Sequence, residues 1–251
     1  VVADGAVERW SALYQLLQDE GAKIRLAGLV RKRWQDRLTQ LGFEPKENES
    51  AADANLRAEL IRTLGTMEDA TVAAQARQRF AALASDPRAM DGPLKSTWLG
   101  IAAENATAQE WDRLAQLAAT SSSTIEQQTY YELLGMVRDP ALAQRALDLA
   151  LTGQAGTTSA AIIAAVASQH PQLAFDFVMH NREKVYALLD ASAQSTYVAD
   201  IAEYANDPAM IARLEELRRT MREDEARPIQ RVIGQLRQRF ADGARVRGGV
   251  A

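Results

Sequence analysis

The sequence predicts an all-α fold, a superhelix of antiparallel helix pairs of the HEAT/armadillo-like α-solenoid type. Its 251 residues include only 14 glycines and 7 prolines, and alanine, leucine and long unbranched polar residues are abundant. These residue types lose little conformational freedom in a helix. Apolar residues recur at intervals of three and four along nearly the whole chain, which is the period of one helix face. Similar helix-start signals also recur about every 70 residues, as in repeat proteins.

The first two helices are predicted from apolar faces and from the residues that end them. One face covers residues 10–17, and Gly21 is its predicted C-cap. A second helix covers residues 24–41 and is predicted to end at Gly42. The polar residues 44–52, which include a proline, are predicted to form a loop.

Two more helices follow this loop. The first carries the apolar residues of 56–64 and is predicted to stop at Gly65, and the second covers residues 72–84. The dipeptide Asp86-Pro87 is then predicted to begin another helix. Aspartate caps unpaired N–H groups at a helix start, and proline in the first position has no donor that needs a partner.

An internal repeat is visible in the spacing of these signals. Gly65 follows a leucine and precedes Asp69, and Gly135 follows a leucine and precedes Asp139, 70 positions later. Asp207, which like Asp139 is followed by proline, lies 68 positions beyond Asp139. Two helix pairs of roughly 35 residues would fill each interval, which predicts a degenerate α-solenoid.

The rest of the chain shows the same helical pattern. Residues 160–168 are small and branched apolar residues, which predicts a helix buried on more than one side. Pro228 is predicted to open the last helix, and residues 242–251 are predicted to form a frayed tail. No long polar linker interrupts the chain, so we expect one domain over residues 1–251. The other apolar stripes lie at Trp111–Ala118, Leu142–Leu149, Phe175–Met179, Val185–Leu189 and Ile211–Leu217.

The composition excludes several classes of function. A net charge of -4 provides no overall basic field for nucleic acid. The absence of cysteine excludes disulfides and thiolate metal sites but leaves the compartment open. No apolar segment is long enough for a membrane span. Because the sequence starts at Val1 without a methionine, we expect it to be a piece of a longer chain.

Candidate catalytic groups are few, and each has a simpler structural interpretation. The two histidines, His170 and His180, are ten residues apart with a proline between them, unlike a helical zinc motif. The cluster 121–123 is three serines without the glycines of a nucleophile elbow, so we interpret it as a capping loop. The pair Glu215-Glu216 lies among arginines, which favours surface salt bridges over acid–base chemistry.

The C-terminal arginines and the tryptophans also have structural interpretations. The arginines are either an arm for nucleic acid or membrane or one solvated helix face, and the acidic chain favours the solvated face. The tryptophans lie in or beside apolar stripes, so we expect them in the core. The residues concerned are Arg227, Arg231, Arg237, Arg239, Arg245 and Arg247, and Trp10, Trp34, Trp98 and Trp111.

A set of short motifs also occurs in a fixed order over roughly residues 1–220. The motifs are Arg33-Trp34, Leu38, Leu41-Gly42-Phe43, Pro45, Leu56-Arg57, Leu64-Gly65, Glu110-Trp111, Glu126, Leu133-Leu134-Gly135, Asp139-Pro140, Arg145-Ala146-Leu147, Phe175, Phe177 and Asn181. By their order and spacing they resemble the C-terminal domain of zinc aminopeptidases of the puromycin-sensitive and endoplasmic-reticulum types. Residues 227–251 resemble this domain least.

The resemblance implies a non-catalytic role. In that family the domain is a bowl of antiparallel helix pairs that faces an upstream catalytic domain, closes the substrate chamber and in some members holds the peptide. The zinc motif His-Glu-x-x-His and the exopeptidase motif Gly-x-Met-Glu-Asn have no counterpart here and would lie upstream of Val1. The resemblance therefore places the zinc cofactor and every catalytic residue in the upstream part of the parent enzyme.

Three cations are candidates for binding the carboxylate of a peptide substrate by residue type. They are Arg57, Arg145 and Lys184, and for each the alternative is a surface or inter-helix salt bridge. A second hypothesis for the whole chain is a stand-alone helical-repeat scaffold that binds a partner protein on its concave face. A third, a nucleic-acid-binding repeat, would require a basic stripe that the composition does not provide.

Overall fold

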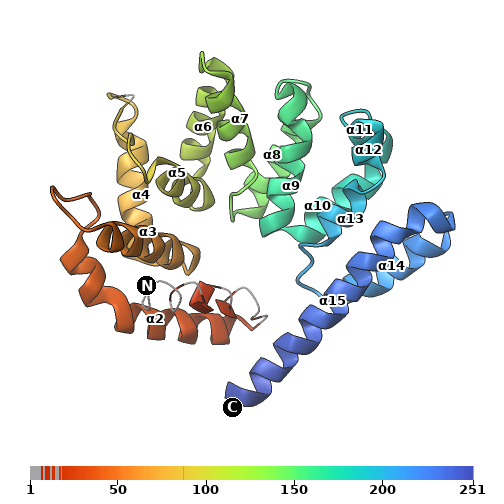
Figure 1. Ribbon diagram of the computed structural model, residues 1–251. Coiled ribbons are helices and arrows are strands. Elements are labelled where there is room, and N and C mark those ends of the chain that lie inside the picture. The colour runs from red at the N-terminus through yellow and green to blue at the C-terminus, as the bar shows by residue number, and fades with distance from the viewer. Residues whose placement is uncertain are drawn as a thin grey trace. The chain divides into compact units, whose positions relative to one another are not determined.

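The computed structural model contains only helices as regular elements in the part of the chain that it describes (Figure 1). The described residues are 19–86 and 88–250 and, before them, residues 7, 9–11, 13, 14 and 17. Consecutive helices pack against each other in pairs, which confirms the predicted all-α solenoid class.

Most helices of the described residues are short to medium in length and follow one another closely along the chain. In chain order they are α2 (Glu20–Leu41), α3 (Ala51–Thr66), α4 (Ala70–Ala82), α5 (Lys95–Glu104), α6 (Ala108–Thr120), α7 (Thr124–Leu134), α8 (Pro140–Ala150), the 3-10 helix η1 (Gly156–Thr158), α9 (Ser159–Gln169), α10 (Pro171–His180), α11 (Arg182–Tyr186), α12 (Ala191–Gln194), α13 (Tyr197–Ala202), α14 (Ala209–Arg219) and α15 (Glu223–Val250).

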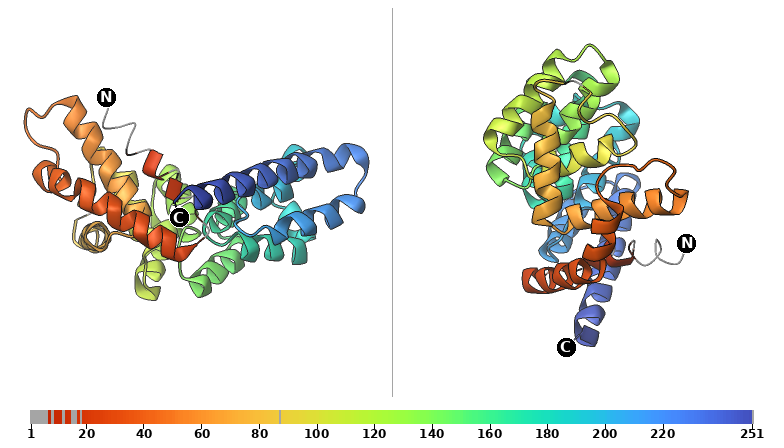
Figure 2. Two further views of the ribbon diagram at one scale, coloured as in Figure 1. Left: turned by 90° about the horizontal axis from the view of Figure 1, so that it is seen from below. Right: turned by 90° about the vertical axis from the view of Figure 1, so that its left-hand side faces the viewer.

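The chain divides into two compact units, residues 1–102 and residues 103–251. In the first unit α2 packs on α3, and α3 packs on α4. In the second unit the main pairs are α6 with α7, α8 with α9, α10 with α13, and α14 with α15. The last pair runs side by side in opposite directions (Figure 2). The expectation of a single domain over residues 1–251 stays a prediction.

The start of α2 corrects one prediction, and its end confirms another. Gly21 is not a C-cap, because it lies in the first turn of α2. The carboxylate of Asp19 begins that helix by accepting a hydrogen bond of 2.6 Å from the backbone N–H of Ala22. Gly42 ends the helix as predicted, with a φ of +72° and an N–H that donates to the carbonyl of Leu38 at 2.8 Å.

Gly65 was expected to stop a helix, but it lies inside α3, so this prediction was wrong. The helix ends in the turn that follows, where Glu68 has a φ of +60° and the N–H of Asp69 donates to the carbonyl of Leu64 at 2.9 Å. Gly65 instead permits close packing, because a Cβ there would lie 2.5 Å from Cδ1 of Ile101.

Gly135 has the corresponding place in the second copy of the repeat. It ends α7, and a Cβ there would lie 2.5 Å from the backbone oxygen of Ile162 and 2.8 Å from Cβ of Ala165, both in α9. The repeated Leu-Gly therefore marks two sites where another helix approaches the backbone closely.

The repeated aspartates cap helices as predicted at two sites, and at a third the aspartate accepts one backbone N–H bond beside the start of a helix without being its N-cap. Asp69 and Asp139 each accept two backbone N–H bonds at 2.8 to 3.1 Å, at the starts of α4 and α8. Pro140 lies in the first turn of α8, and Asp207 accepts a bond of 2.9 Å from Ala209 at the start of α14. These contacts confirm the spacing inferred for the repeat.

The fourth site, Asp86, does not begin a helix. Its carboxylate accepts a bond of 2.9 Å from the N–H of Arg88 in a turn, and the next helix starts only at Lys95. Pro87 lies outside the described residues. In such a turn and in a helix cap alike, the aspartate side chain accepts a hydrogen bond from a backbone N–H that follows it. The local sequence therefore does not distinguish a turn from a helix start.

The last helix is longer at both ends than the sequence suggests. It begins at Glu223, so Pro228 lies inside its second turn rather than at its start. It continues through Asp242 to Val250, so the predicted frayed tail is helical up to that residue. The helix buries an apolar side consisting of Ala226, Ile229, Val232, Ile233 and Leu236. This packing compensates for the hydrogen bond that proline removes.

The centre of the second unit is α9, as the apolar run predicted. It contacts α7, α8, α10 and α13, and its residues Ile162 and Val166 are fully buried. Two tryptophans are also core residues, since Trp98 and Trp111 are 3% exposed. The core prediction was wrong for the other two, Trp10 and Trp34, which are only half-buried.

We predict that alanine destabilises the fold at two glycines and stabilises it at a third. Gly135→Ala should lower the free energy of unfolding by about 1–3 kcal/mol, because the new Cβ meets backbone that cannot move aside. Gly65→Ala should cost less, because the side chain of Ile101 can adjust. Gly28→Ala, in α2 with open space around its Cβ, should stabilise by about 0.5–1 kcal/mol. Urea unfolding of the three variants measures this order, and a neutral Gly135→Ala would contradict the close approach.

Candidate functional site

The histidines are helix-end residues in this structure. The Nε2–H of His170 donates to the carbonyl of Val137 at 2.9 Å, and the Nδ1–H of His180 donates to the carbonyl of Asp176 at 2.7 Å. No three His, Asp or Glu side chains of the described residues lie together as a metal-binding group. None of the described helices is long and apolar enough to cross a membrane.

The serine cluster caps a helix, as the sequence predicted. Ser123 is the N-cap of α7 and accepts a bond from the N–H of Glu126 at 3.4 Å. The hydroxyl of Ser121 donates to the carboxylate of the same glutamate at 3.1 Å. Both hydroxyls therefore stabilise the start of α7.

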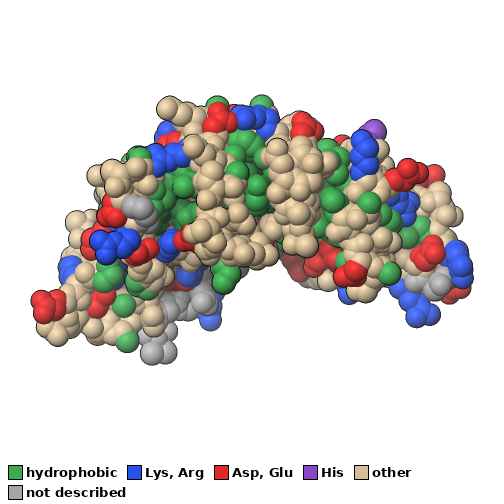
Figure 3. All heavy atoms as spheres, turned by 90° about the horizontal axis from the view of Figure 1, so that it is seen from above, with side chains coloured by type: hydrophobic (Ala, Val, Ile, Leu, Met, Phe, Trp, Pro, Cys, Tyr) green, Lys and Arg blue, Asp and Glu red, His purple; other side chains and the backbone are tan. Residues whose placement is uncertain are grey.

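The paired carboxylates at 215 and 216 form salt bridges, as expected. Glu215 pairs with Arg237 of α15, and Glu216 pairs with Arg219 at 3.0 Å. The face drawn in Figure 3 likewise mixes Lys and Arg with Asp and Glu side chains rather than presenting one basic stripe.

The C-terminal arginines do more than the predicted solvated face. Arg239 is only partly exposed and donates to the carbonyl of Glu203 at 2.8 Å and to that of Ala205. Burial lowers the pKa of this guanidinium. Arg231 lies 3.9 Å from the carboxylate of Asp200. These contacts join α15 to α13 and the turn after it. The side chains of Arg245 and Arg247 lie outside the described part.

Arg57, the first substrate-binding candidate, has an internal partner. Its side chain is 2% exposed, and its two terminal nitrogens bind the two carboxylate oxygens of Glu49, one of them at 2.9 Å. The hydrogen bonds from Arg57 lower the pKa of Glu49, and the same bonds raise the pKa of Arg57.

This pair fixes the loop between α2 and α3. Arg79 of α4 holds the same loop through Glu44 at 2.5 Å, and Phe43 packs edge-on against Trp98 with ring centres 5.9 Å apart. Arg79 also lies over the ring of Trp98, 4.7 Å from its centre. The loop is therefore attached to the rest of the first unit by two ion pairs and an aromatic contact.

Arg145, the second candidate, connects two helices of the second unit. Its guanidinium lies 4.3 Å from the ring centre of Trp111 and binds the carboxylate of Asp112 at 2.6 Å. Because Arg145 is in α8 and its partners are in α6, the contact joins two successive helix pairs. About half of each charged side chain stays exposed.

The same arrangement occurs a second time. Arg213 of α14 lies 4.6 Å from the ring centre of Phe175 in α10 and pairs with Asp176. In both copies the arginine follows an aspartate of an Asp-Pro dipeptide by six residues, and the acid directly follows the aromatic residue. That spacing was a sequence signal for the contact. We call the two sets, Trp111-Asp112-Arg145 and Phe175-Asp176-Arg213, the arginine clamps.

Lys184, the third candidate, lies exposed on the short helix α11. Its ammonium forms no ion pair with the described residues. It is on a different helix from Arg145, and Arg57 belongs to the other compact unit. The structure leaves the substrate-binding role of all three as a prediction.

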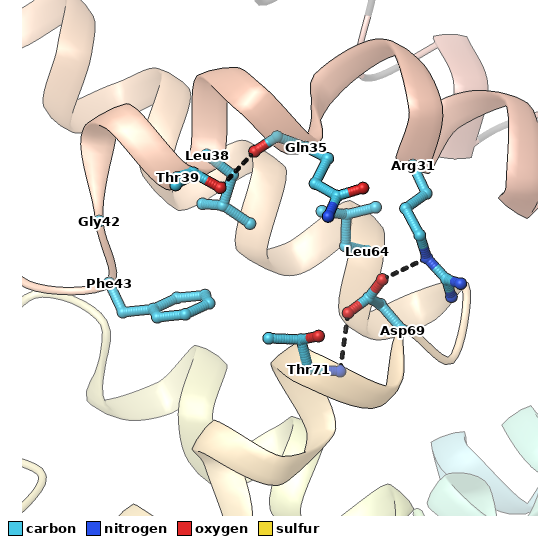
Figure 4. A pocket seen from close by; sticks show the side chains of 9 residues that line it. All are labelled: Arg31, Gln35, Leu38, Thr39, Gly42, Phe43, Leu64, Asp69 and Thr71. Carbon is cyan, nitrogen blue, oxygen red and sulfur yellow. Dashed lines mark hydrogen bonds and ion pairs between the residues drawn. The ribbon is translucent and has the colours of Figure 1, made fainter.

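The sequence did not indicate the pocket that the structure shows in the first unit (Figure 4). It has a volume of about 260 Å³ and lies between α2, the loop after it, the end of α3 and the start of α4. Its lining residues are Arg31, Gln35, Leu38, Thr39, Gly42, Phe43, Leu64, Asp69 and Thr71.

One ion pair forms the polar side of this pocket. The Nε of Arg31 donates to Asp69 at 2.7 Å, while the other carboxylate oxygen of Asp69 caps α4 (Figure 4). The two terminal nitrogens of Arg31 make no hydrogen bond to any described residue. The lining also includes apolar side chains, namely Leu38, Leu64 and Phe43. The pocket can therefore hold an apolar group beside an anionic or polar one.

Comparison with known protein families identifies the chain. The ERAP1-like C-terminal domain matches residues 1–240. The chain belongs to this family. It is thus the non-catalytic helical domain found in M1 aminopeptidases, as the ordered motifs suggested. The matched range includes the first part of α15, which the motifs had left out. Among curated proteins, the comparison finds no match.

We predict that the Glu49–Arg57 pair stabilises the fold in a pH-dependent way. The pKa of Glu49 is lowered in the folded state, below an unfolded value of about 4.3. The stabilisation is therefore present above that value and is lost as pH falls through the folded-state pKa. Glu49→Gln should lower the midpoint of thermal unfolding at pH 7, and the difference should narrow towards pH 3. Glu47→Gln, in the same loop, is the control, and an equal difference at both pH values would contradict this prediction.

We also predict that the arginine clamps are energetically equivalent. Arg145→Ala and Arg213→Ala should each lower the free energy of unfolding by about 1 kcal/mol, from a lost cation–π contact and a lost exposed ion pair. A double-mutant cycle on Arg145 and Asp112 should give a coupling of about 0.2–1 kcal/mol. Arg145→Lys should behave like the alanine variant, because lysine lacks the planar group that stacks. Full stability of Arg145→Lys would contradict the stacking.

Proposed function

We propose that this chain is the C-terminal domain of a zinc-dependent aminopeptidase that removes N-terminal residues from peptides, and that it closes the substrate chamber and contributes to peptide binding. The observation that carries the proposal is the family match over residues 1–240. The ordered motifs, spread from Arg33 to Asn181, agree with it. Peptide and upstream catalytic domain are the partners that this role requires.

In this role the chain contributes shape and fixed charge. Zinc, held by the upstream domain, would supply the Lewis acid and the activated water for peptide hydrolysis. The helix pairs of this chain would exclude bulk water from the peptide and limit where it can lie. The arginine clamps support that function by holding successive helix pairs together in the second unit.

Of the three cations proposed for binding a peptide carboxylate, Lys184 has the most accessible charge. It is exposed and has no ion pair with a described residue, whereas Arg145 shares its charge with Asp112. Arg57 would first have to leave Glu49. A carboxylate bound by an ammonium is a charge-assisted contact, which is stronger than one between neutral groups.

We therefore predict that Lys184→Ala in the complete parent enzyme raises KM for long peptides about tenfold, the equivalent of about 1.4 kcal/mol. Turnover of a small aminoacyl reporter should not change, because the reporter has no distant carboxylate. Arg227→Ala, an exposed cation on α15, is the matched control. Unchanged dependence on peptide length in Lys184→Ala would remove Lys184 from peptide binding.

The wider proposal has its own test in the gene that encodes the chain. A His-Glu-x-x-His motif some hundreds of residues upstream, together with aminopeptidase activity of the complete protein, is the expected result. A start codon close to Val1 would contradict the proposal and favour the stand-alone scaffold.

A further inference from the structure

The helix α2 exposes two large apolar side chains among the residues that the structure describes. Ile24 is 72% exposed and Leu29 is 62% exposed. Among the large apolar side chains that the structure describes as exposed, the others are Ile125 and Tyr204. Ile24 and Leu29 are five residues apart, about 140° around the helix, so only Ile24 belongs to the stripe that leads to the pocket.

One stripe of α2 connects this region to the pocket. Ile24, Gly28, Arg31, Gln35 and Thr39 follow at intervals of four, three, four and four, so they lie along one side of the helix. The stripe is about 22 Å long, from the rise of about 1.5 Å per residue. Gly28 leaves a gap in it, since nothing lies within 4 Å of the position of its Cβ. We call this stripe together with the pocket the α2 face.

The volume of the pocket suits one inserted side chain of a partner segment. Its volume of about 260 Å³ is below the range of roughly 300–1,000 Å³ for small-molecule sites. Leu38, Leu64 and Phe43 provide its apolar side. A single large apolar side chain of a protein segment fits this combination better than a free cofactor does.

The charged residues of α2 indicate which residues flank the inserted apolar side chain in the docking segment. The helix has six cationic and two acidic residues, a net charge of +4, in a chain whose total is -4. Lys32 and Arg33 form no ion pair with described residues, and Arg31 has two terminal nitrogens without partners there. The other cations of the helix pair with Glu20, Asp19, Asp69 and Asp53. A complementary segment therefore carries a carboxylate beside its apolar residue, within reach of Lys32 and the terminal nitrogens of Arg31. The charged residues counted are Lys23, Arg25, Arg31, Lys32, Arg33 and Arg37 against Glu20 and Asp36.

We propose that the α2 face is the docking surface for an acidic segment of the upstream catalytic part of the parent enzyme, one that inserts a large apolar side chain into the pocket and places a carboxylate beside Lys32 and Arg31. The proposal rests on the proposed function, because it takes its occupant from the same polypeptide. One helix face is too small for a stable interface between separate molecules. Attachment within one chain raises the effective concentration to about the millimolar range, so such a surface is then sufficient. This favours a tethered segment over a second copy of the chain.

Zero-length coupling of amines to carboxylates in the complete parent enzyme tests the contact directly. A carbodiimide should join Lys32 to an Asp or Glu of the upstream part, identified by mass spectrometry of the digest. The pair Lys23–Glu20, 2.8 Å apart, is the internal control for the chemistry. Coupling of Lys32 only to Asp36, or only to a second molecule, would overturn the proposal.

A matched pair of variants separates docking from folding. Gly28→Glu places a negative charge on the α2 face, and Gly234→Glu places one on α15, where the glycine also has open space around it. Gly28→Glu should lower the yield of the Lys32 link at least tenfold, and Gly234→Glu should leave it unchanged, with similar unfolding midpoints for both. Equal yields in the two variants would overturn the proposal. A parent protein without a zinc motif would overturn the proposed function and the docking together, whereas an active parent without the link would overturn the docking alone.

Discussion

Close approach between helices at two glycines is the constraint on which much of this fold depends. At Gly135 a Cβ would lie 2.5 Å from the carbonyl oxygen of Ile162, and at Gly65 it would lie 2.5 Å from Cδ1 of Ile101. Each glycine is followed after four residues by an aspartate that caps the next helix. Close packing and capping together determine where one helix ends, how near its neighbour lies and where the next helix starts. The repeat of about 70 residues is the recurrence of this unit.

Ion pairs and arginine–aromatic contacts further stabilise the helix packing that the glycines permit. Asp69 caps α4 with one oxygen and holds Arg31 with the other, so a residue of the repeat also forms the polar side of the pocket. In the second unit the capping residue Asp139 is followed six residues later by Arg145, which stacks on Trp111. The spacing of the repeat therefore brings these arginines to the same position in each clamp. Because the clamps are half-exposed, they contribute modestly to stability and mainly fix how neighbouring helix pairs are aligned.

The sequence predicted those structural features that depend on residues close together in the chain. The caps at Asp69 and Asp139 and the helix end at Gly42 could be predicted from short segments, because a cap or a helix-ending glycine acts within one helix turn. Gly65 was misinterpreted because glycine serves both a helix end and a close approach, and the residue that approaches it lies 36 positions away. Arg145 and Asp112 are 33 positions apart, and the pocket combines three helices and a loop. Such pairings follow from packing, which the local pattern does not contain.

In the function we propose, this chain is the helical domain of an aminopeptidase whose chemistry lies in its upstream part. The most direct measurement combines elemental analysis for zinc with an assay of an aminoacyl reporter on the purified 251-residue protein, before and after incubation with zinc. We expect a folded, helical protein that retains no stoichiometric zinc and does not hydrolyse the reporter. One bound zinc per chain together with turnover of the reporter would contradict this expectation.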